Sequence, residues 1–373
     1  MTFPVRICIV EGAETGIVSS TGTFVLFDGQ GREFGNLTRL EFSLAGFSLM
    51  DADGNTTALK AGDVRLVPMD ASQPLLLNEK PYRGEMRLVL SGGKMDLVNV
   101  LNLEDYLCGV LPGELKTSAA EAEKAQAIVA RTYAVGKALK NKKRMYDLRA
   151  TSADQVYGGC GVEDPSCNQA VEETRGLILA FQGKLAGDVF YHSTCGGSTE
   201  SAEVVFCGRP VEYLTAVPCT MKDSQEELCS FSRYFRWSVE WKKEELDEIL
   251  RTTLGNSIGH LQSLRILAKG PSGRVSELEV RGDNASVVLK GDEMRHFLQF
   301  KNEDGNLRPL YSTRFDIEEG KDFIRLAGSG WGHGVGLCQM GAIGMARKGA
   351  SSAGILKHYF PGVEVEELSR VIP

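Results

Sequence analysis

Glycine stands at every second position from Gly328 to Gly336, within the segment GSGWGHGVGLCQMGA. Because successive side chains of an extended strand point to opposite faces, such a strand would have one face without side chains. Its other face would carry Trp331 and His333. Glycine costs conformational entropy in a strand, so a bare face needs a reason. Two explanations stay open: close packing against another part of the backbone, or a groove in which a ligand lies.

Composition places the chain among globular proteins with a sizeable core. It has 373 residues, of which 42% are hydrophobic and 24% are charged, enough for two or three cooperating units. No run approaches the roughly 18 apolar residues of a membrane span. The start MTFPVRICIV lacks the features of a signal peptide. The net charge of -7 argues against nucleic acid as a partner.

The chain divides by pattern into four stretches, which together predict an α+β protein. Residues 1–97 consist of short β-prone runs separated by turn clusters and form a β-rich N-terminal region. Residues 98–235 form the first part of a mixed core with a long alanine-rich helix. Residues 236–326 look like an inserted α+β subdomain, and residues 327–373 supply the C-terminal part of the core.

The long helix is expected to begin at Ser118, with Glu121 completing a capping box. Just before it, the tetrapeptide LPGE presents Glu114 from a turn. Nearby helix amides would favour the ionised carboxylate, whereas general acid catalysis near neutral pH needs an apolar pocket. Arg131 lies about 20 Å along the helix from Ser118, so we expect a structural role for it.

The cysteines are unusually clustered, since six of the nine fall within seventy residues. This clustering indicates bonds to one another or to a metal. None of the spacings matches the tight CxxC pairs of a zinc ribbon, and disulfides of an exported protein fit them equally well. Three further cysteines have apolar neighbours and are interpreted as small core residues; they are Cys8, Cys108 and Cys338.

Several motifs occur in order from about Val98 to Val363 and together resemble the SpoIID/LytB family. This family contains the sporulation stage II D proteins and the amidase enhancers. The motifs are YLCGVLPGELKTSAAEAEKAQAIVARTYAV, TSADQVYGG, AVEETRGLILAFQGKLAGDVFYHSTCGGSTESAEVVF, RWSVEW, GRVSELEV and GWGHGVGLCQMGAIGMARKGASSAGILKHYFPG.

The resemblance implies a lytic transglycosylase, which cuts peptidoglycan between N-acetylmuramic acid and N-acetylglucosamine and leaves an anhydro-muramic end. The catalytic glutamate of the family lies in its GE turn, which here is Glu114. One carboxylate would serve as both acid and base, so no cofactor is required for the chemistry. Ordinary glycosidases pair two carboxylates, and the sequence offers no evidence for a second.

Other polar residues of the motifs are candidates for binding glycan, because they lie on loops at strand ends. Trp331 would stack on a sugar, and His333 would donate or accept hydrogen bonds. The alternative for most of them is capping of turns and helices. The substrate-binding candidates are Gln155, Tyr157, His192, Ser193, Trp331, His333 and Gln339.

Some members of the family hold zinc near the active site, so Cys195, Cys219 and Cys229 are the expected metal ligands. Disulfides and free thiols stay open as alternatives. Three cysteines with an open position would be compatible with a catalytic metal, whereas four would make the metal structural. The chain departs from the family pattern at three positions, namely Cys160, Cys167 and Cys207.

The resemblance also predicts partners and location. Peptidoglycan glycan strands are the expected ligand, and a cell-wall amidase is a second expected partner. The protein would then act in the cell envelope, outside the cytoplasm, with its export signal or anchor beyond this sequence. Two other functions stay open: a relative of the amidase enhancers that binds the wall and cuts nothing, and a zinc-dependent hydrolase.

Overall fold

The computed structural model describes residues 3–221 and 226–372. Two compact units divide the chain: unit 1 comprises Met1–Asp188 and Val365–Pro373, and unit 2 comprises Val189–Glu364. Both contain helices and strands, and the N-terminal region is rich in strands, which confirms the predicted α+β class. Among the helices of the described residues, none is both long and apolar enough to span a membrane.

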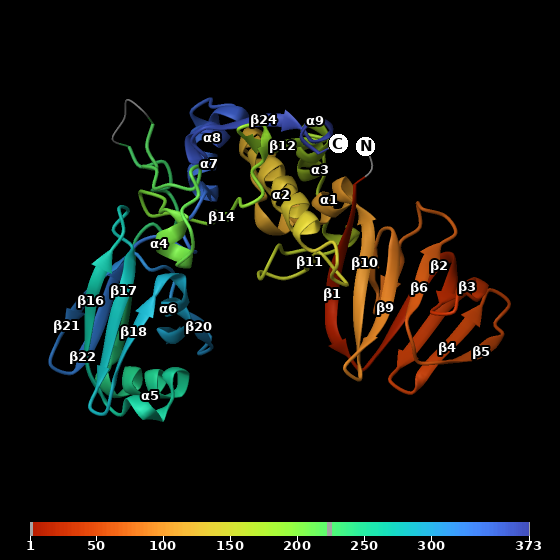
Figure 1. The fold of residues 1–373 in the computed structure, drawn as a ribbon, viewed down its shortest axis with the longest axis horizontal. Coiled ribbons are helices and arrows are strands. Elements are labelled where there is room, and N and C mark those ends of the chain that lie inside the picture. Colours follow the sequence, from red (N-terminus) through yellow and green to blue (C-terminus); the bar gives the residue numbers. More distant parts are fainter. Residues whose placement is uncertain (1–2, 222–225, 373) are drawn as a thin grey trace. The chain divides into compact units, whose positions relative to one another are not determined.

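Unit 1 begins with a large sheet built from the β-prone runs of the N-terminal region (Figure 1). Its main path runs β11-β1-β10-β9-β6-β2-β3-β4-β5, and β7 joins β2 to β8. Alternate side chains of these strands, such as Phe24, Leu26 and Leu40, are buried on one side, as half-buried strands require. The strands are β1 (Pro4–Ala13), β2 (Thr15–Asp28), β3 (Glu33–Ser43), β4 (Gly46–Asp51), β5 (Thr56–Lys60), β6 (Val64–Pro68), β7 (Leu75–Leu77), β8 (Lys80–Tyr82), β9 (Glu85–Ser91), β10 (Lys94–Asn102) and β11 (Leu148–Arg149).

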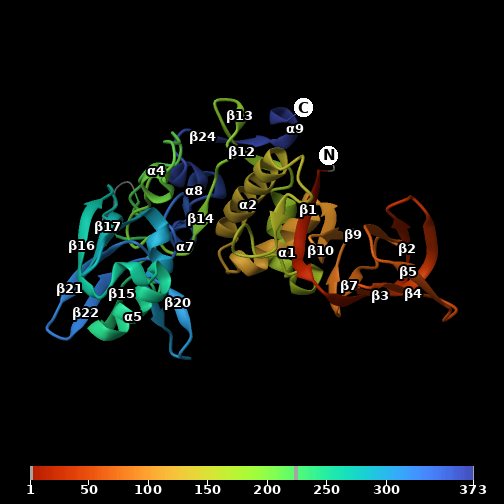
Figure 2. The ribbon, with the colours of Figure 1, turned by 60° about the horizontal axis from the view of Figure 1, so that its bottom comes forward.

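Two helices follow the sheet and lie side by side in both views (Figures 1 and 2). The first, α1 (Leu103–Glu114), was not expected, because Pro112 and two glycines obscure its helical pattern. The second, α2 (Ala120–Lys140), is the predicted alanine-rich helix. Its alanines are almost all buried, which confirms that they allow close packing.

The predicted capping box at the start of α2 is wrong. The N-cap residue is Ala119, which has no side-chain cap. Instead, Glu123 Oε1 accepts a hydrogen bond of 2.9 Å from the backbone N–H of Thr117. The carboxylate of Glu123 therefore accepts a hydrogen bond from a backbone N–H before the helix, as the glutamate of a capping box does, but it lies two residues after the predicted Glu121.

The rest of unit 1 follows the sequence prediction closely. A short helix, α3 (Pro165–Glu173), ends shortly before Gly176, whose φ is +74°. Strands β12 (Leu177–Phe181) and β13 (Lys184–Leu185) form the hairpin that the sequence predicts, but it turns at Gln182 and Gly183, both with positive φ, and not at the predicted pair Gly183–Lys184. The remaining elements are the 3-10 helix η1 (Cys160–Val162), β24 (Val363–Glu367), which pairs with β12, and α9 (Leu368–Val371).

Unit 2 contains its own hydrophobic core, formed by residues between Val239 and Leu326. Two three-stranded sheets, β15-β22-β21 and β16-β17-β18, supply most of that core together with α5 (Lys243–Leu254). Their strands are β15 (Trp237–Lys242), β16 (Leu261–Lys269), β17 (Val275–Gly282), β18 (Ser286–Lys290), β21 (Phe315–Glu319) and β22 (Phe323–Gly328).

Around this core lie short elements that carry the polar motifs. Strands β14 (Tyr191–His192) and β23 (Leu337–Cys338) pair in parallel, and so join two distant motifs. The other elements of unit 2 are α4 (Ala202–Phe206), η2 (Asn256–Ile258), η3 (Gly291–Glu293), α6 (Met294–Phe297), β19 (Gln299–Lys301), β20 (Leu307–Pro309), α7 (Gln339–Arg347) and α8 (Ser352–Tyr359).

Candidate active site and cysteine cluster

Glu114 is the last residue of α1, so it does not lie in a free turn as the sequence predicted. Its side chain is partly exposed, and its Oε1 atom accepts a hydrogen bond of 2.8 Å from the backbone N–H of Val156. The carbonyl end of a helix disfavours a negative charge, whereas a donated N–H favours one. The carboxyl group is therefore partly accessible, and the Val156 N–H orients one of its oxygens.

The loop that carries Val156 is held by two buried side chains. Gln155 is fully buried, and its Oε1 atom accepts a hydrogen bond of 3.1 Å from the Tyr106 hydroxyl. Tyr157 is also buried and donates a hydrogen bond of 2.8 Å to Asn99 Oδ1. The predicted substrate contacts of Gln155 and Tyr157 do not fit this burial. Both residues instead fix the loop that donates to Glu114.

A second carboxylate, Asp154, belongs to the same loop but is fully engaged. Its Oδ1 atom accepts hydrogen bonds from the Tyr133 hydroxyl at 2.9 Å and from Lys137 Nζ at 2.7 Å. Its Oδ2 atom accepts one of 2.9 Å from the backbone N–H of Arg149. Three donors, one of them a cation, therefore occupy both oxygens of Asp154 and close the loop.

Two buried tyrosines report the electrostatics around Glu114. Burial raises the pKa of Tyr106 well above its usual range, and the charges of Asp154 and Glu114 add to this rise. Burial likewise raises the pKa of Tyr133, with further contributions from the same two carboxylates. Both phenols therefore stay neutral near Glu114, where each can donate or accept a hydrogen bond.

Arg131 has the structural role expected from its position. It is completely buried, and its guanidinium donates to both carboxylate oxygens of Glu104 in α1, at 3.0 and 2.7 Å. It also donates to the carbonyl groups of Val171 and Leu177. These bonds tie α1 to α2 and the following hairpin, so they fix the helix that ends in Glu114.

The glycine-rich segment of unit 2 is not the extended strand that its alternation predicted. Strand β22 ends at Gly328, and four of the five glycines have φ values between +72° and +101°. A Cβ atom at any of the five would lie 2.2–2.9 Å from another atom of unit 2. The protein itself therefore fills the bare side of the segment, which supports the packing explanation and not a groove at these glycines.

Two histidines in this region form hydrogen bonds with the main chain. His333 Nδ1 accepts a hydrogen bond of 3.0 Å from the Val335 N–H, so its protonated Nε2 donates to the Tyr191 carbonyl at 2.9 Å. His192 is buried and donates from Nδ1 to the Val335 carbonyl at 3.2 Å. Burial lowers the pKa of His333 to about 4 and that of His192 well below its usual range. Both rings are therefore neutral near pH 7.

The other predicted binding residues of unit 2 differ in exposure. Trp331 is 40% exposed, and its ring lies 4.3 Å from that of Tyr234, measured between centroids. Ser193 is partly buried, with its hydroxyl 3.3 Å from that of Thr194. Gln339 is buried at the start of α7. Trp331 is thus the member of this set that best fits direct contact with a ligand.

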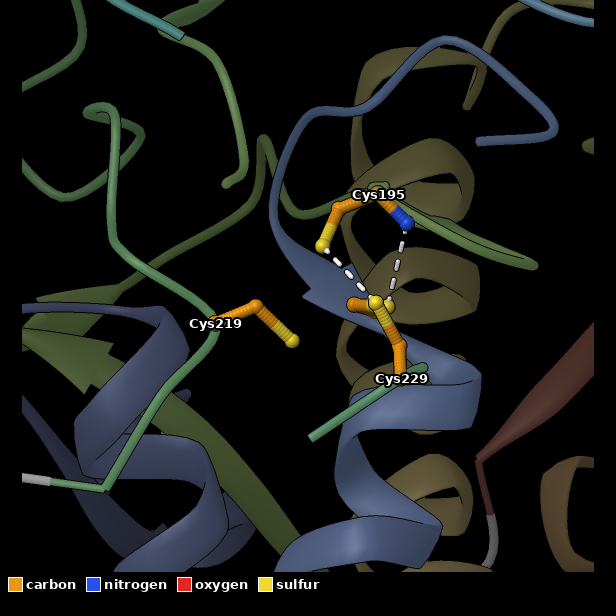
Figure 3. Close-up of side chains that lie close together, drawn as sticks. Cys195, Cys219 and Cys229 are labelled. Carbon is orange, nitrogen blue, oxygen red and sulfur yellow. Dashed lines mark hydrogen bonds between the residues drawn. The ribbon is translucent and has the colours of Figure 1, made fainter. Parts of the chain in front are cut away.

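Four cysteines of unit 2 converge in a buried cluster, and their Sγ atoms all lie within 4.8 Å of one another. Figure 3 shows the thiols of Cys195, Cys219 and Cys229 directed toward a common centre. The fourth member, Cys338, is buried as the sequence predicts for a core residue, but the sequence did not indicate that it belongs to the cluster. It is the N-cap of α7 and lies 143 residues from Cys195 in the chain.

The spacing of the cluster is compatible with a metal site. Four thiolates about 2.3 Å from a zinc ion lie roughly 3.8 Å apart, and the Sγ atoms of Cys195 and Cys229 are 3.6 Å apart. That distance also exceeds the roughly 2.05 Å of a disulfide bond. All nine cysteines, each in the described part of the chain, are free thiols, so disulfides are not formed. Four buried cysteines leave no open position for a catalytic metal.

The surroundings of the cluster affect its thiols unequally, because hydrogen bonds from the neighbouring sulfurs lower the pKa of Cys229, whereas other members of the cluster resist ionisation. Backbone N–H groups of Cys195, Gly197 and Gly341 donate to its sulfur atoms at 3.2–3.4 Å. Yet burial raises the pKa of the Cys338 thiol, and neighbouring sulfurs raise that of Cys219. The four sulfurs can therefore all ionise together only around a positive ion.

Comparisons with known proteins agree with these features. A family model described as Stage II sporulation protein matches residues 91–181, which include Glu114 and the loop of Val156. The chain belongs to the SpoIID/LytB family. A second model, described as a domain of unknown function (DUF8618), matches residues 211–336.

Relatives in the curated proteins include three that cover most of this chain. An uncharacterized protein of Brachyspira hyodysenteriae is 33% identical over 85% of this chain and 82% of its own length. The amidase enhancer of Bacillus subtilis is 28% identical over 69% of this chain. Stage II sporulation protein D of the same organism is 26% identical over 72% of this chain and 76% of its own length. The chain spans 39% of the amidase enhancer's length.

The functional features of this SpoIID/LytB member that the sequence did not predict all depend on residues that are close in space but distant in sequence. Cys338 had one local signal, a glycine three residues later whose N–H caps the sulfur. Val156 acts through its backbone N–H and therefore has no signature at all. An aromatic cluster around Tyr234 had a signal in the segment SRYFRW, which is rich in rings and cations.

Proposed function

We propose that this protein is a peptidoglycan lytic transglycosylase, with Glu114 as its general acid and base. The proposal depends on one observation above all: the carboxyl of the family's glutamate position ends α1, is accessible, and is oriented by the Val156 N–H. Family membership and relatives named for sporulation and for amidase enhancement support a role at the cell wall.

A single working carboxylate favours the non-hydrolytic reaction. Asp154, the other carboxylate whose charge acts on Tyr106 and Tyr133, is occupied by Tyr133, Lys137 and the Arg149 N–H. It is therefore poorly placed to activate a water or to attack a sugar, as the second carboxylate of a glycosidase must. A lytic transglycosylase needs no such partner, because the nucleophile is a hydroxyl of the substrate itself.

The reaction takes two proton transfers at one oxygen atom. Protonated Glu114 donates to the glycosidic oxygen between N-acetylmuramic acid and N-acetylglucosamine, and the bond to the muramic C1 breaks through an oxocarbenium-like state. The resulting carboxylate then accepts the proton of the muramic C6 hydroxyl while that oxygen bonds to C1. An anhydro-muramic end forms, no water is consumed, and Glu114 is protonated again.

The cysteine cluster, in this proposal, holds one structural zinc ion through Cys195, Cys219, Cys229 and Cys338. Zinc fits the donor set and spacing, and the complex of four thiolates would carry a net negative charge. The buried guanidinium of Arg274 donates to the Cys195 carbonyl at 3.2 Å and partly offsets that charge. The zinc would fix β14 and α7 of unit 2, and it takes no part in the chemistry at Glu114.

The proposed substrate also sets the location and the partners. Peptidoglycan lies outside the cytoplasm, so the protein would act in the cell envelope on glycan strands, in sporulation or in other remodelling of the wall. The name of the amidase enhancer relative supports a second candidate function, in which the protein binds glycan and a cell-wall amidase without cutting. Both functions involve the same polymer, but only the transglycosylase requires Glu114 as acid and base.

Incubation of the purified protein with glycan strands stripped of stem peptides tests the proposal. Mass analysis should find anhydro-muramic ends, and Glu114→Gln should lower their formation by about 10²–10⁴-fold, because it removes the transferable proton. Asp105→Asn is the matched control, since Asp105 is an exposed carboxylate in the first turn of the same helix.

Three results would contradict the proposal. New reducing ends would indicate hydrolysis, intact strands that bind to the protein would indicate the non-catalytic alternative, and normal cutting by Glu114→Gln would remove the assigned role of this residue.

A further inference from the structure

An aromatic pocket lies in the part of unit 2 that matches the domain of unknown function. It has a volume of about 660 Å³, within the roughly 300–1,000 Å³ typical of ligand sites. Its walls come from the segment before β15, from β15 itself and from the β19-β20 hairpin. The residues on which its character depends are Tyr234, Trp237, Tyr311, Arg233, Asn302 and Asp304.

The rings of the pocket form a continuous row that reaches the glycine-rich motif. Tyr311 contacts Phe300, Trp237 and Tyr234, with centroids 4.7, 5.6 and 5.2 Å apart. Tyr234 in turn contacts Trp331 at 4.3 Å. Tyr234, Trp237 and Tyr311 are partly exposed, and Trp331 is 40% exposed. The pocket therefore presents the partly exposed rings of Tyr234, Trp237 and Tyr311 to a ligand, and Trp331 adjoins Tyr234 outside the pocket lining.

The rings are fixed before any ligand arrives. Trp237 Nε1 donates a hydrogen bond of 2.8 Å to the Gly330 carbonyl. Its ring also lies flat against Gly328, where a Cβ atom would come within 2.2 Å of it. Arg233 covers one face of Tyr234 at 4.6 Å and donates to its hydroxyl at 2.5 Å. Rings held in this way lose little conformational entropy on binding.

The charges around the pocket restrict the kind of ligand. Arg233 and Lys301 are its cations, whereas four carboxylates line it, those of Glu240, Glu245, Glu303 and Asp304. An excess of acidic groups disfavours polyanions such as nucleic acids or phosphate-rich polymers. Asn302, Ser238 and the carboxylates instead offer hydrogen bonds to neutral hydroxyl and amide groups.

We propose that the aromatic pocket binds β-linked amino-sugar strands, as a glycan site separate from the chemistry at Glu114. A pyranose ring has an apolar face of C–H groups that stacks on an aromatic ring and a rim of hydroxyls that bonds to polar side chains. The row from Trp331 to Phe300 with its polar border supplies both kinds of contact. The proposal rests on the proposed function only for the identity of the polymer.

Binding of a hexamer of β-1,4-linked N-acetylglucosamine tests the site, because this probe contains no muramic acid to be cut. Titration calorimetry and tryptophan fluorescence should show saturable binding, equal in the wild type and in Glu114→Gln. Tyr234→Ala should weaken the affinity about tenfold, since it interrupts the row between Trp331 and Tyr311. Ser238→Arg, at an exposed position of β15, should obstruct the pocket without altering the core.

Phe231→Ala is the matched control, because Phe231 is 47% exposed but does not line the pocket. Thermal melting should confirm that all variants fold. Absence of hexamer binding, or equal weakening by Phe231→Ala and Tyr234→Ala, would overturn the inference. A protein that cuts denuded strands but ignores the hexamer would refute the pocket alone, and one that binds the hexamer but never cuts would refute the transglycosylase alone.

Discussion

In unit 1, hydrogen bonds between side chains of separate segments hold the loop beside Glu114. In residues 328–338 of unit 2, by contrast, side chains such as His333 form hydrogen bonds with the main chain. Tyr106, Gln155 and Tyr157 hold the loop beside Glu114, and the carboxylate stays accessible. In unit 2 other atoms lie within 3 Å of the positions that Cβ atoms would take at these glycines, and both nitrogens of His333 bond to main-chain groups.

The contrast teaches where chemistry should be expected in this family member. A histidine in a conspicuous glycine-rich motif can serve the fold alone, because both of its ring nitrogens form hydrogen bonds with main-chain groups that would otherwise lack a partner. A glutamate in an ordinary helix end can be the reactive group, because the fold leaves it accessible. Substitutions in unit 2 should therefore reduce the free energy of unfolding first, and substitutions at Glu114 should reduce cutting first.

The largest effect on stability is expected from Cys338→Ser. Loss of one of four ligands should remove the zinc and lower the free energy of unfolding by more than about 4 kcal/mol, since metal binding and folding are coupled. Metal analysis and denaturant unfolding measure both changes. Cys207→Ser is the control, because Cys207 is exposed and outside the cluster. A Cys338→Ser protein that still holds one zinc per chain would show that the cluster is not a four-cysteine site.

A smaller effect is expected from Gly334→Ala, compared with Gly349→Ala. Both glycines have φ of +85°, so each variant has the same backbone penalty of about 1–2 kcal/mol. A Cβ atom at Gly334 would also lie 2.2 Å from Arg274 Nε, whereas Gly349 has open space around it. We expect a total loss of about 3–5 kcal/mol for Gly334→Ala in denaturant unfolding.

Equal losses for the two variants would mean that the glycines of the motif serve backbone conformation alone. Close packing against Arg274 would then no longer explain why the motif needs a residue without a side chain at this position.

Local patterns predicted much of the fold. Short β-prone runs between turn clusters indicated the N-terminal sheet, and alanine content indicated α2. Local breakers caused the miss of α1, because Pro112 in its last turn hides a helix whose other residues pack well. Alternation also misled at Gly328 to Gly336, because a sequence does not show the sign of φ.

Of the candidate sites, the sequence could predict the single residue Glu114, but not the complete sets of residues that come together in the folded structure. The resemblance indicated Glu114, but the donor at Val156 is a backbone N–H that any residue except proline would supply at this position. The fourth cysteine lies 143 residues from the first, and only the pairing of β14 with β23 brings them together. The aromatic row likewise combines residues from three distant segments. Such sets form by tertiary packing, which leaves little trace in local sequence.

The smallest effect is expected from Tyr157→Phe. This variant tests whether Tyr157 supports the loop, and so affects stability, or contacts the glycan, and so affects cutting. The change removes a buried hydrogen bond of 2.8 Å to Asn99 Oδ1 and should lower the free energy of unfolding by about 1–2 kcal/mol. Cutting should fall no more than about threefold, because the Val156 N–H still orients Glu114. Glu114→Gln should show the opposite pattern, with normal stability and little cutting. If Tyr157→Phe instead abolished cutting at unchanged stability, Tyr157 would contact the glycan, and loop support would not explain its burial beside Glu114.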